Sequence, residues 1–287
     1  MVQQEQRLKM NEAKLRVILL THGGAEKVLE QLCALDSIEV AGVFVETANP
    51  PKRSLVEKLK RSVRYDGYIE TCKKLFGSTR DQNHSSVGGS LDDMKGLATA
   101  NNFPCHIVTD YHASDSISLI RSVDADLAVV FGTNILKETV FGSPKLGSIN
   151  FHSGLVPHYR GGPPVFWELF NNESELGLTV HWMAKKVDTG DVIVQDRVPL
   201  SYDASYGLDF EKFISDYRSE LAGKCASLVA RAVDLIAKGA APRIPQNPQE
   251  GHRYRLPVKK EKDELRRRLK LRTAQTQNGR SPKRNPE

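Results

Sequence analysis

Short β-branched runs alternate with segments of helical periodicity over most of the first 150 residues. Leu15–Leu20 is an apolar run (LRVILL), and after a glycine turn Ala25–Leu35 carries its apolar residues at helical spacing. A second apolar run, Ile38–Val45, follows directly. A strand, a helix and a strand in this order predict a βαβ unit, and therefore a parallel sheet.

The same alternation resumes near residue 91 and predicts the rest of the sheet. The expected elements are a helix over 91–101, a strand over Cys105–Val108, a helix over Ser114–Val123, a strand over Leu127–Phe131, a helix over Leu136–Phe141 and a strand over Ser148–His152. Two further strands, Leu176–Met183 and Val192–Leu200, are joined by a short loop. We therefore expect an α/β fold with a mostly parallel sheet and flanking helices.

Polar segments divide the chain into expected domains. Residues 1–13 are polar and are expected to be flexible, and the α/β domain covers 14–204. A basic stretch at about 50–90 with two amphipathic patterns predicts a helical insertion. Residues 205–272 predict a helical C-terminal extension, with helices over 205–238 and 259–271, and 273–287 should form a disordered basic tail.

Composition places the chain among ordinary globular proteins. Hydrophobic residues make up 39% and charged residues 26% of its 287 residues. No run approaches the length of a membrane span, and the polar start has no apolar signal region, so a cytoplasmic location and no membrane partner are expected. Four scattered cysteines favour reduced thiols over a disulfide or zinc set.

The positive charge is concentrated in two segments. Residues 251–287 hold 13 basic and 4 acidic side chains, whereas the whole chain has a net charge of only +6. A second basic segment, residues 51–80, holds nine basic against three acidic side chains. Such segments can bind phosphate or nucleic acid, but they are also typical of solvated helix faces and soluble tails.

The first candidate for chemistry is the turn Thr21-His22-Gly23-Gly24, between a strand and a helix. Backbone amides at a helix N-terminus can bind a phosphate. The turn lacks the GxGxxG spacing of a dinucleotide site, so a structural tight turn explains it equally well.

Polar residues are densest between residues 147 and 190. Asn150 and His152 lie two apart at the end of an expected strand, so their side chains point to the same side of the sheet. Asp188 lies in a tight loop between two later strands, and Arg160 in a glycine-rich turn could bind an anion. An amide, an imidazole and a carboxylate suit acyl transfer through a charged tetrahedral intermediate.

Each of these residues alone also has a structural interpretation. Loop aspartates such as Asp188 often stabilise turns, and a histidine at a strand end is often structural. We interpret His158 and His181 as structural, and Trp167 and Trp182 as core residues. The histidines are too sparse to predict a metal site.

This region resembles the formyltransferase family that uses 10-formyltetrahydrofolate, which includes methionyl-tRNA formyltransferase and phosphoribosylglycinamide formyltransferase. The spacing from Asn-x-His to the Asp-Thr-Gly loop, which begins 36 residues after the histidine, is its most specific feature. The resemblance rests on Asn150-Phe151-His152-Ser153, Leu155-Val156-Pro157-His158-Tyr159-Arg160-Gly161, Pro164 with Trp167, Gly177-Leu178-Thr179-Val180-His181 and Asp188-Thr189-Gly190-Asp191.

The resemblance implies a Rossmann-like sheet and a catalytic trio of Asn150, His152 and Asp188. Asn150 would donate to the formyl oxygen, His152 would act as an imidazolium, and Asp188 would sustain that charge and relay a proton. No metal is implied. The folate co-substrate would bind through Phe131, Gly132, Ile135, Leu136, Val187 and Asp188, and the acceptor through Arg160, Gly161 and His22.

For the acceptor, we expect the primary amine of a small phosphorylated metabolite, of the amino sugar nucleotide or phosphoribosylglycinamide type. Family members that formylate methionyl-tRNA carry a β-barrel after the catalytic domain, and the 49 residues after Lys238 show no run of alternating strands. Methionyl-tRNA remains the alternative acceptor, since the basic segments could bind tRNA.

Three other functions would each explain part of the sequence. A formyltetrahydrofolate hydrolase would need an additional N-terminal domain, for which the residues before Leu15 leave no room. A nicotinamide dehydrogenase would need the missing glycine fingerprint. A non-catalytic RNA- or phosphate-binding protein would leave the trio unexplained.

Overall fold

The computed structural model describes residues 14–47, 60, 63–65, 91–247 and 249–277. Most of the expected insertion and the whole N-terminal segment lie outside these residues. Seven strands form one sheet in the order β3-β2-β1-β4-β5-β7-β8. They are β1 (Leu15–Thr21), β2 (Ile38–Glu46), β3 (Cys105–Val108), β4 (Leu127–Phe131), β5 (Ser148–His152), β7 (Glu175–Trp182) and β8 (Val192–Pro199).

The sheet is parallel from β3 to β5, and β7 and β8 add to it in antiparallel pairing. The expected α/β class with a mostly parallel sheet is therefore confirmed. Because the chain moves outward from β1 to β2 and then returns to β4, the order reverses between β1 and β4. Ligands of such sheets bind in the crevice beyond the carboxyl ends of the strands at this reversal.

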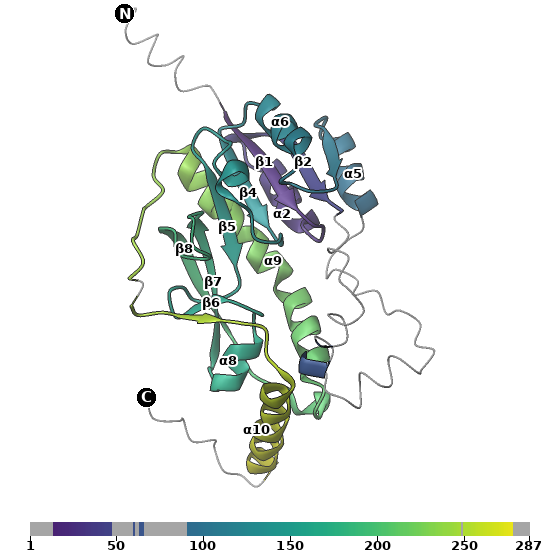
Figure 1. Cartoon of the computed structure of the whole chain (residues 1–287), viewed down its shortest axis with the longest axis vertical. Coiled ribbons are helices and arrows are strands. Elements are labelled where there is room, and N and C mark those ends of the chain that lie inside the picture. Colours follow the sequence, from purple (N-terminus) through teal and green to yellow (C-terminus); the bar gives the residue numbers. More distant parts are fainter. Residues whose placement is uncertain (1–13, 48–59, 61–62, 66–90, 248, 278–287) are drawn as a thin grey trace, which may run out of the picture.

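Helices cover both faces of the sheet (Figure 1). Val17 and Leu19 of β1 pack in the cluster formed with α2 (Glu26–Cys33), α5 (Leu91–Ala100) and α9 (Phe210–Ala237). Ile18 and Leu20 face the opposite cluster, formed with α6 (Ser114–Ser122) and α7 (Glu138–Phe141). The alternation of side chains along an apolar strand thus builds two cores from one run of residues.

The long helix α9 begins later than the expected residue 205. A 3₁₀ turn over Ala204–Tyr206 precedes it, and the Asp209 side chain caps its N-terminus by accepting from the Lys212 amide at 3.0 Å. An aspartate at this position satisfies an amide that has no partner within the helix, which fixes where the helix starts.

Two short strands differ from expectation. The glycine-rich turn contains a strand, β6 (Tyr159–Gly161), which pairs in parallel with β9 (His252–Tyr254). The following helix, α8 (Phe166–Asn171), begins after the two prolines. A strand of three residues is too short to show a hydrophobic periodicity. Its hydrogen-bonding partner is also distant in the sequence, so the sequence alone does not reveal it.

The C-terminal helix, α10 (Lys259–Gln277), extends six residues beyond the expected Leu271 and into the expected tail. It packs on the body through Leu265 and Leu269, which are fully buried. Arg268 and Arg272 donate to the carbonyl oxygens of Phe170 and Leu169, at 2.7 and 2.9 Å, and so cap α8. These contacts hold residues that composition alone assigned to solvent. None of the described helices is long and apolar enough to cross a membrane.

Candidate active site

Asn150 and His152 lie at the carboxyl end of β5, on the same side of the strand. The antiparallel neighbour β7 pairs His181 directly with Asn150. The Asn150 Nδ2 atom is 3.3 Å from His181 Nε2. The loop between β7 and β8 then brings Asp188 between the two histidines, with its Oδ2 3.6 Å from His152 Nδ1 and its Oδ1 3.5 Å from His181 Nε2. The expected trio is thus one cluster, with His181 as a fourth member.

Backbone carbonyls fix the tautomers of both rings. His152 Nε2 lies 2.6 Å from the Tyr159 carbonyl oxygen, and His181 Nδ1 lies 2.8 Å from that of Trp182. Since a carbonyl oxygen can only accept, each of these nitrogens carries a hydrogen. The remaining nitrogens, His152 Nδ1 and His181 Nε2, both face Asp188. His181 Nε2 also contacts the Asn150 amide, and this contact orients the Asn150 side chain.

Asp188 is held by its backbone conformation and by a distant amide. Its φ of +53° lies in the left-handed region, which aspartate tolerates better than most residues. The Gly161 amide of β6 donates to Oδ2 at 2.9 Å. Burial acts to raise the pKa of Asp188, but its contacts with the His181 and His152 rings and the hydrogen bond from the Gly161 amide together lower it to about 2. Asp188 is therefore a carboxylate across the physiological range.

Burial lowers the pKa of His152, and this effect outweighs the opposing influences of the Asp188 charge and the Tyr159 carbonyl. Asp188 acts in the expected direction, since its charge raises the pKa of the ring. The expected role of His152 as an imidazolium stays a prediction.

A pocket of about 560 Å³ opens beside this cluster. It is lined by the trio and by six further residues that sequence reasoning assigned to folate or acceptor binding or that adjoin them: Gly132, Ile135, Leu136, Gly161, Gly162 and Val187. Residues from the segment after β4, from β5, from β6 and from the β7–β8 loop thus meet at one cavity. Its size suits a drug-sized organic ligand.

Three of the expected binding residues lie elsewhere. Phe131 stacks on Phe151 at 5.2 Å between ring centroids and lines a neighbouring hollow with Gly24. His22 Nε2 forms a short hydrogen bond with the buried Glu46, whose carboxylate also accepts from the Tyr111 amide. Arg160 is directed towards the C-terminal segment, with Nη2 3.4 Å from the Gly251 carbonyl oxygen. None of the three lines the cavity beside the trio, and their roles stay predictions.

Sequence reasoning missed two contributors to the site. His181 was interpreted as structural, although a histidine inside an otherwise apolar strand was a signal of special surroundings. Arg253, Tyr254, Arg255 and Leu256 also line the cavity. They lie about 100 residues after the trio in a proline-rich region, and only the β6–β9 pairing reveals that they return to it.

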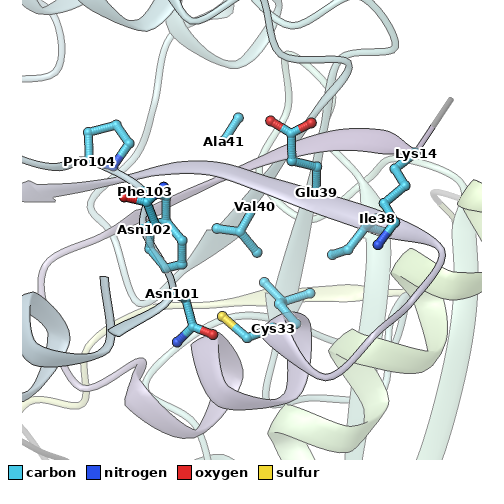
Figure 2. Close-up of a pocket in the computed structure, with 11 residues that line it drawn as sticks. Lys14, Cys33, Ile38, Glu39, Val40, Ala41, Asn101, Asn102, Phe103 and Pro104 are labelled. Carbon is cyan, nitrogen blue, oxygen red and sulfur yellow. The ribbon is translucent and has the colours of Figure 1, made fainter. Parts of the chain in front are cut away.

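Two further features lie outside the cluster, one in α8 and one at the opposite end of the sheet. Glu168 is buried, and its Oε2 has no partner among the described residues; burial raises its pKa to about 7. A separate hollow of about 330 Å³, lined by Lys14, Cys33 and Asn101 among others, lies at the amino ends of β1, β2 and β3 (Figure 2). It is remote from the carboxyl ends, where the candidate chemistry is.

Comparisons with known proteins bear on this arrangement. A family model described as formyl transferase matches residues 73–208. The methionyl-tRNA formyltransferase of Moorella thermoacetica is 32% identical over 172 residues, covering 59% of this chain and 52% of that protein. The one from Syntrophus aciditrophicus is 37% identical over 132 residues, covering 45% and 39%. The chain thus spans about half or less of the length of these curated relatives.

Solved structures share the fold at lower identity. The phosphoribosylglycinamide formyltransferase of Anaplasma phagocytophilum has a TM-score of 0.53 and 18% identity, covering 79% of this chain and 89% of that one. A 4-N formyltransferase from Francisella tularensis has a TM-score of 0.51 and 17% identity, covering 84% and 76%. Both similarities concern the fold alone.

Proposed function

We infer from these matches that the chain is a member of the formyl transferase family, and we propose that it transfers a formyl group from 10-formyltetrahydrofolate to a primary amine. The observation that carries the proposal is the convergence of Asn150, His152 and Asp188 on one cavity, which Ile135 and Val187 also line. The folate is a co-substrate here, and the cavity has the volume and mixed lining that such a ligand requires.

The reaction would proceed by direct attack of the neutral amine on the formyl carbon. The carbonyl π electrons move to the formyl oxygen, and Asn150 Nδ2 donates a hydrogen bond to the developing oxyanion. One such donor is worth about 3–4 kcal/mol in the transition state. The His181 ring, 3.3 Å from that amide, keeps the donor oriented.

His152 would receive the proton that the attacking nitrogen loses. Burial lowers the pKa of His152, which favours the neutral ring, and in that form Nδ1 has a lone pair on the side facing Asp188. When Nδ1 takes up the proton, the imidazolium lies beside a carboxylate that is already ionised, which stabilises the charged state. Collapse of the intermediate restores the carbonyl and expels the folate nitrogen, which takes the proton back from His152.

Release of tetrahydrofolate tests this proposal. The protein is incubated with 10-formyltetrahydrofolate and a panel of primary amines, and both tetrahydrofolate and the formylated amine are measured. Equal amounts of the two products are expected with the right acceptor. Tetrahydrofolate released together with formate, and without any formylated amine, would instead identify a hydrolase and contradict the proposal.

For the acceptor, we propose a small phosphorylated amine of the amino sugar nucleotide or phosphoribosylglycinamide type. The described residues after α9 support this choice, because they contribute β9 to the catalytic cavity and α10 to the body rather than the strands of a separate barrel. Methionyl-tRNA is the second candidate, because the curated relatives reported above are methionyl-tRNA formyltransferases.

Competition separates the two acceptors. Turnover of a small phosphorylated amine at low salt should be unaffected by added tRNA. Formylation of charged initiator tRNA alone, with a rate that falls steeply as salt increases, would assign the second function instead.

A further inference from the structure

The catalytic cavity has one wall that comes from the far C-terminal part of the chain. We call residues 251–256 the strap. After α9, the chain runs along the side of the sheet and crosses beside β6 before it enters α10 (Figure 1). Four strap residues, Arg253 to Leu256, line the cavity that holds the trio.

Aromatic stacking and hydrogen bonds fix the strap in place. Tyr254 stacks between Tyr159 and Trp167, with ring centroids 5.2 and 5.0 Å away, and its hydroxyl accepts from Asn171 Nδ2 at 2.9 Å. Trp167 Nε1 donates to the Arg255 carbonyl oxygen at 2.8 Å. The side chain of Tyr254 and the backbone of Arg255 are therefore anchored, which limits where the Arg253 side chain can reach.

Glycines let the strap approach the catalytic loop closely. A Cβ at Gly161 would collide with the carbonyl oxygen of Tyr254, and a Cβ at Gly251 would collide with that of Pro157. Gly161 is also the residue whose amide binds Asp188. Strap, β6 and catalytic carboxylate thus form one connected unit.

Three cationic side chains line the cavity, and two of them are already paired. Lys185 Nζ lies 3.1 Å from Glu138 Oε2. Arg255 forms a two-pronged ion pair with Glu261, at 3.0 and 2.7 Å. Within the described residues, the exposed Arg253 guanidinium has no hydrogen bond or ion pair. It therefore offers the cavity a positive charge and a planar fork of donors without a protein partner.

Resting on the function proposed above, we propose that Arg253 binds a carboxylate of the glutamate tail of the formylfolate. The pterin is expected beside Ile135 and Val187 in the same cavity, and a folate carries its carboxylates at the opposite end from the pterin. A guanidinium matches the geometry of a carboxylate and can bind it through two parallel hydrogen bonds. The strap thus supplies affinity for the tail, while β5 and the Asp188 loop supply the chemistry.

Equilibrium binding of two stable ligands tests the assignment. One is 5-formyltetrahydrofolate, and the other is its pteroyl amide analogue, which replaces the glutamate by an uncharged carboxamide and carries no carboxylate. The full-length protein is expected to prefer the glutamate-bearing ligand by about fivefold at low salt, with the preference shrinking as ionic strength rises. Arg253→Gln should abolish this preference and leave the affinity for the analogue unchanged, and Arg253→Lys should restore part of it.

Arg231→Gln is the matched control, because it removes the same charge from an exposed site on α9 away from the cavity. It should retain the full preference. If Arg253→Gln also kept it, or weakened both ligands equally, the proposal would be overturned. An unchanged preference with a raised KM for a phosphorylated acceptor would assign the guanidinium to that substrate instead. Failure of the unaltered protein to bind either ligand would refute the proposed function itself.

Discussion

The mechanism proposed above gives Asn150, His152 and Asp188 different roles, so their substitutions should have distinct effects. Asn150→Ala removes the proposed donor to the oxyanion, and kcat should fall by about 10²–10³-fold. His152→Ala removes the proposed proton acceptor and Asp188→Ala its proposed charge partner, and each should abolish measurable transfer. Because all three residues lie beside a cavity, circular dichroism and thermal unfolding should remain close to those of the unaltered protein. Near-normal turnover by His152→Ala would contradict the mechanism.

The pH profile tests which form of His152 is active. Burial lowers the pKa of His152, so the neutral ring should persist below its ordinary pKa of 6.5. If the neutral ring accepts the proton, the acid limb of kcat lies below pH 6.5, and activity falls as the ring becomes protonated. The measurement uses an acceptor amine of low pKa, so that its own titration does not intrude. A kcat that rises as pH falls through this range would indicate an active imidazolium.

Glu168 should make stability depend on pH. The folded protein keeps its proton to about pH 7, whereas the unfolded chain releases it near the ordinary value of 4.5. The unfolded state therefore binds fewer protons in this window, and the free energy of unfolding falls as pH rises from 4.5 to 7, by about 3 kcal/mol. Glu168→Gln keeps the shape without the charge, so urea unfolding should show a flatter profile. The exposed Glu175→Gln should leave the slope unchanged.

At the scale of elements, the pairing of β6 with β9 depends on one glycine, Gly161. Gly161 has a φ of +78° and lies against the Tyr254 carbonyl oxygen. Gly161→Ala should displace the strap, lower folate affinity and reduce kcat through the lost amide contact with Asp188.

Gly223→Ala provides the opposite case. Gly223 lies in α9, and a Cβ there would meet nothing within 4 Å. Alanine in a helix interior is favoured over glycine by about 1 kcal/mol, so thermal unfolding should shift upwards while activity is unchanged. Equal effects of the two substitutions on activity would show that the tight approach at Gly161 is not specific.

The sequence predicted the long apolar elements well, because β1, β2, β4 and α9 each show a recognisable hydrophobic pattern within a single continuous run. It also indicated Asn150, His152 and Asp188, which the fold brings into one cluster, since two residues of one strand end and one tight loop are local patterns. It could not locate Tyr159–Gly161 and His252–Tyr254 as strands, because each is defined only by the other. The lowering of the pKa of His152 was likewise hidden, since burial is a property of the assembled fold.

At the scale of the whole molecule, α10 is a structural part of the body rather than a soluble tail. Leu265→Ala should destabilise the protein by about 2–5 kcal/mol, because its side chain is fully buried, whereas the half-exposed Leu271→Ala should change little. Chemical denaturation measures both. A chain cut after Leu271 should lose some stability as well, since Arg272 would no longer cap Leu169.

The strap also has a consequence for the order in which the protein is made. Ribosomes release the chain from its N-terminus, and the sheet together with α9 is complete in sequence by residue 237. The wall that pairs with Tyr159–Gly161 emerges later, and its contacts join residues about 90 positions apart, which are slow to form. A nascent chain can therefore hold a formed sheet before it holds a finished cavity, so the proposed capacity to bind folate should arise only after His252–Tyr254 have been synthesised.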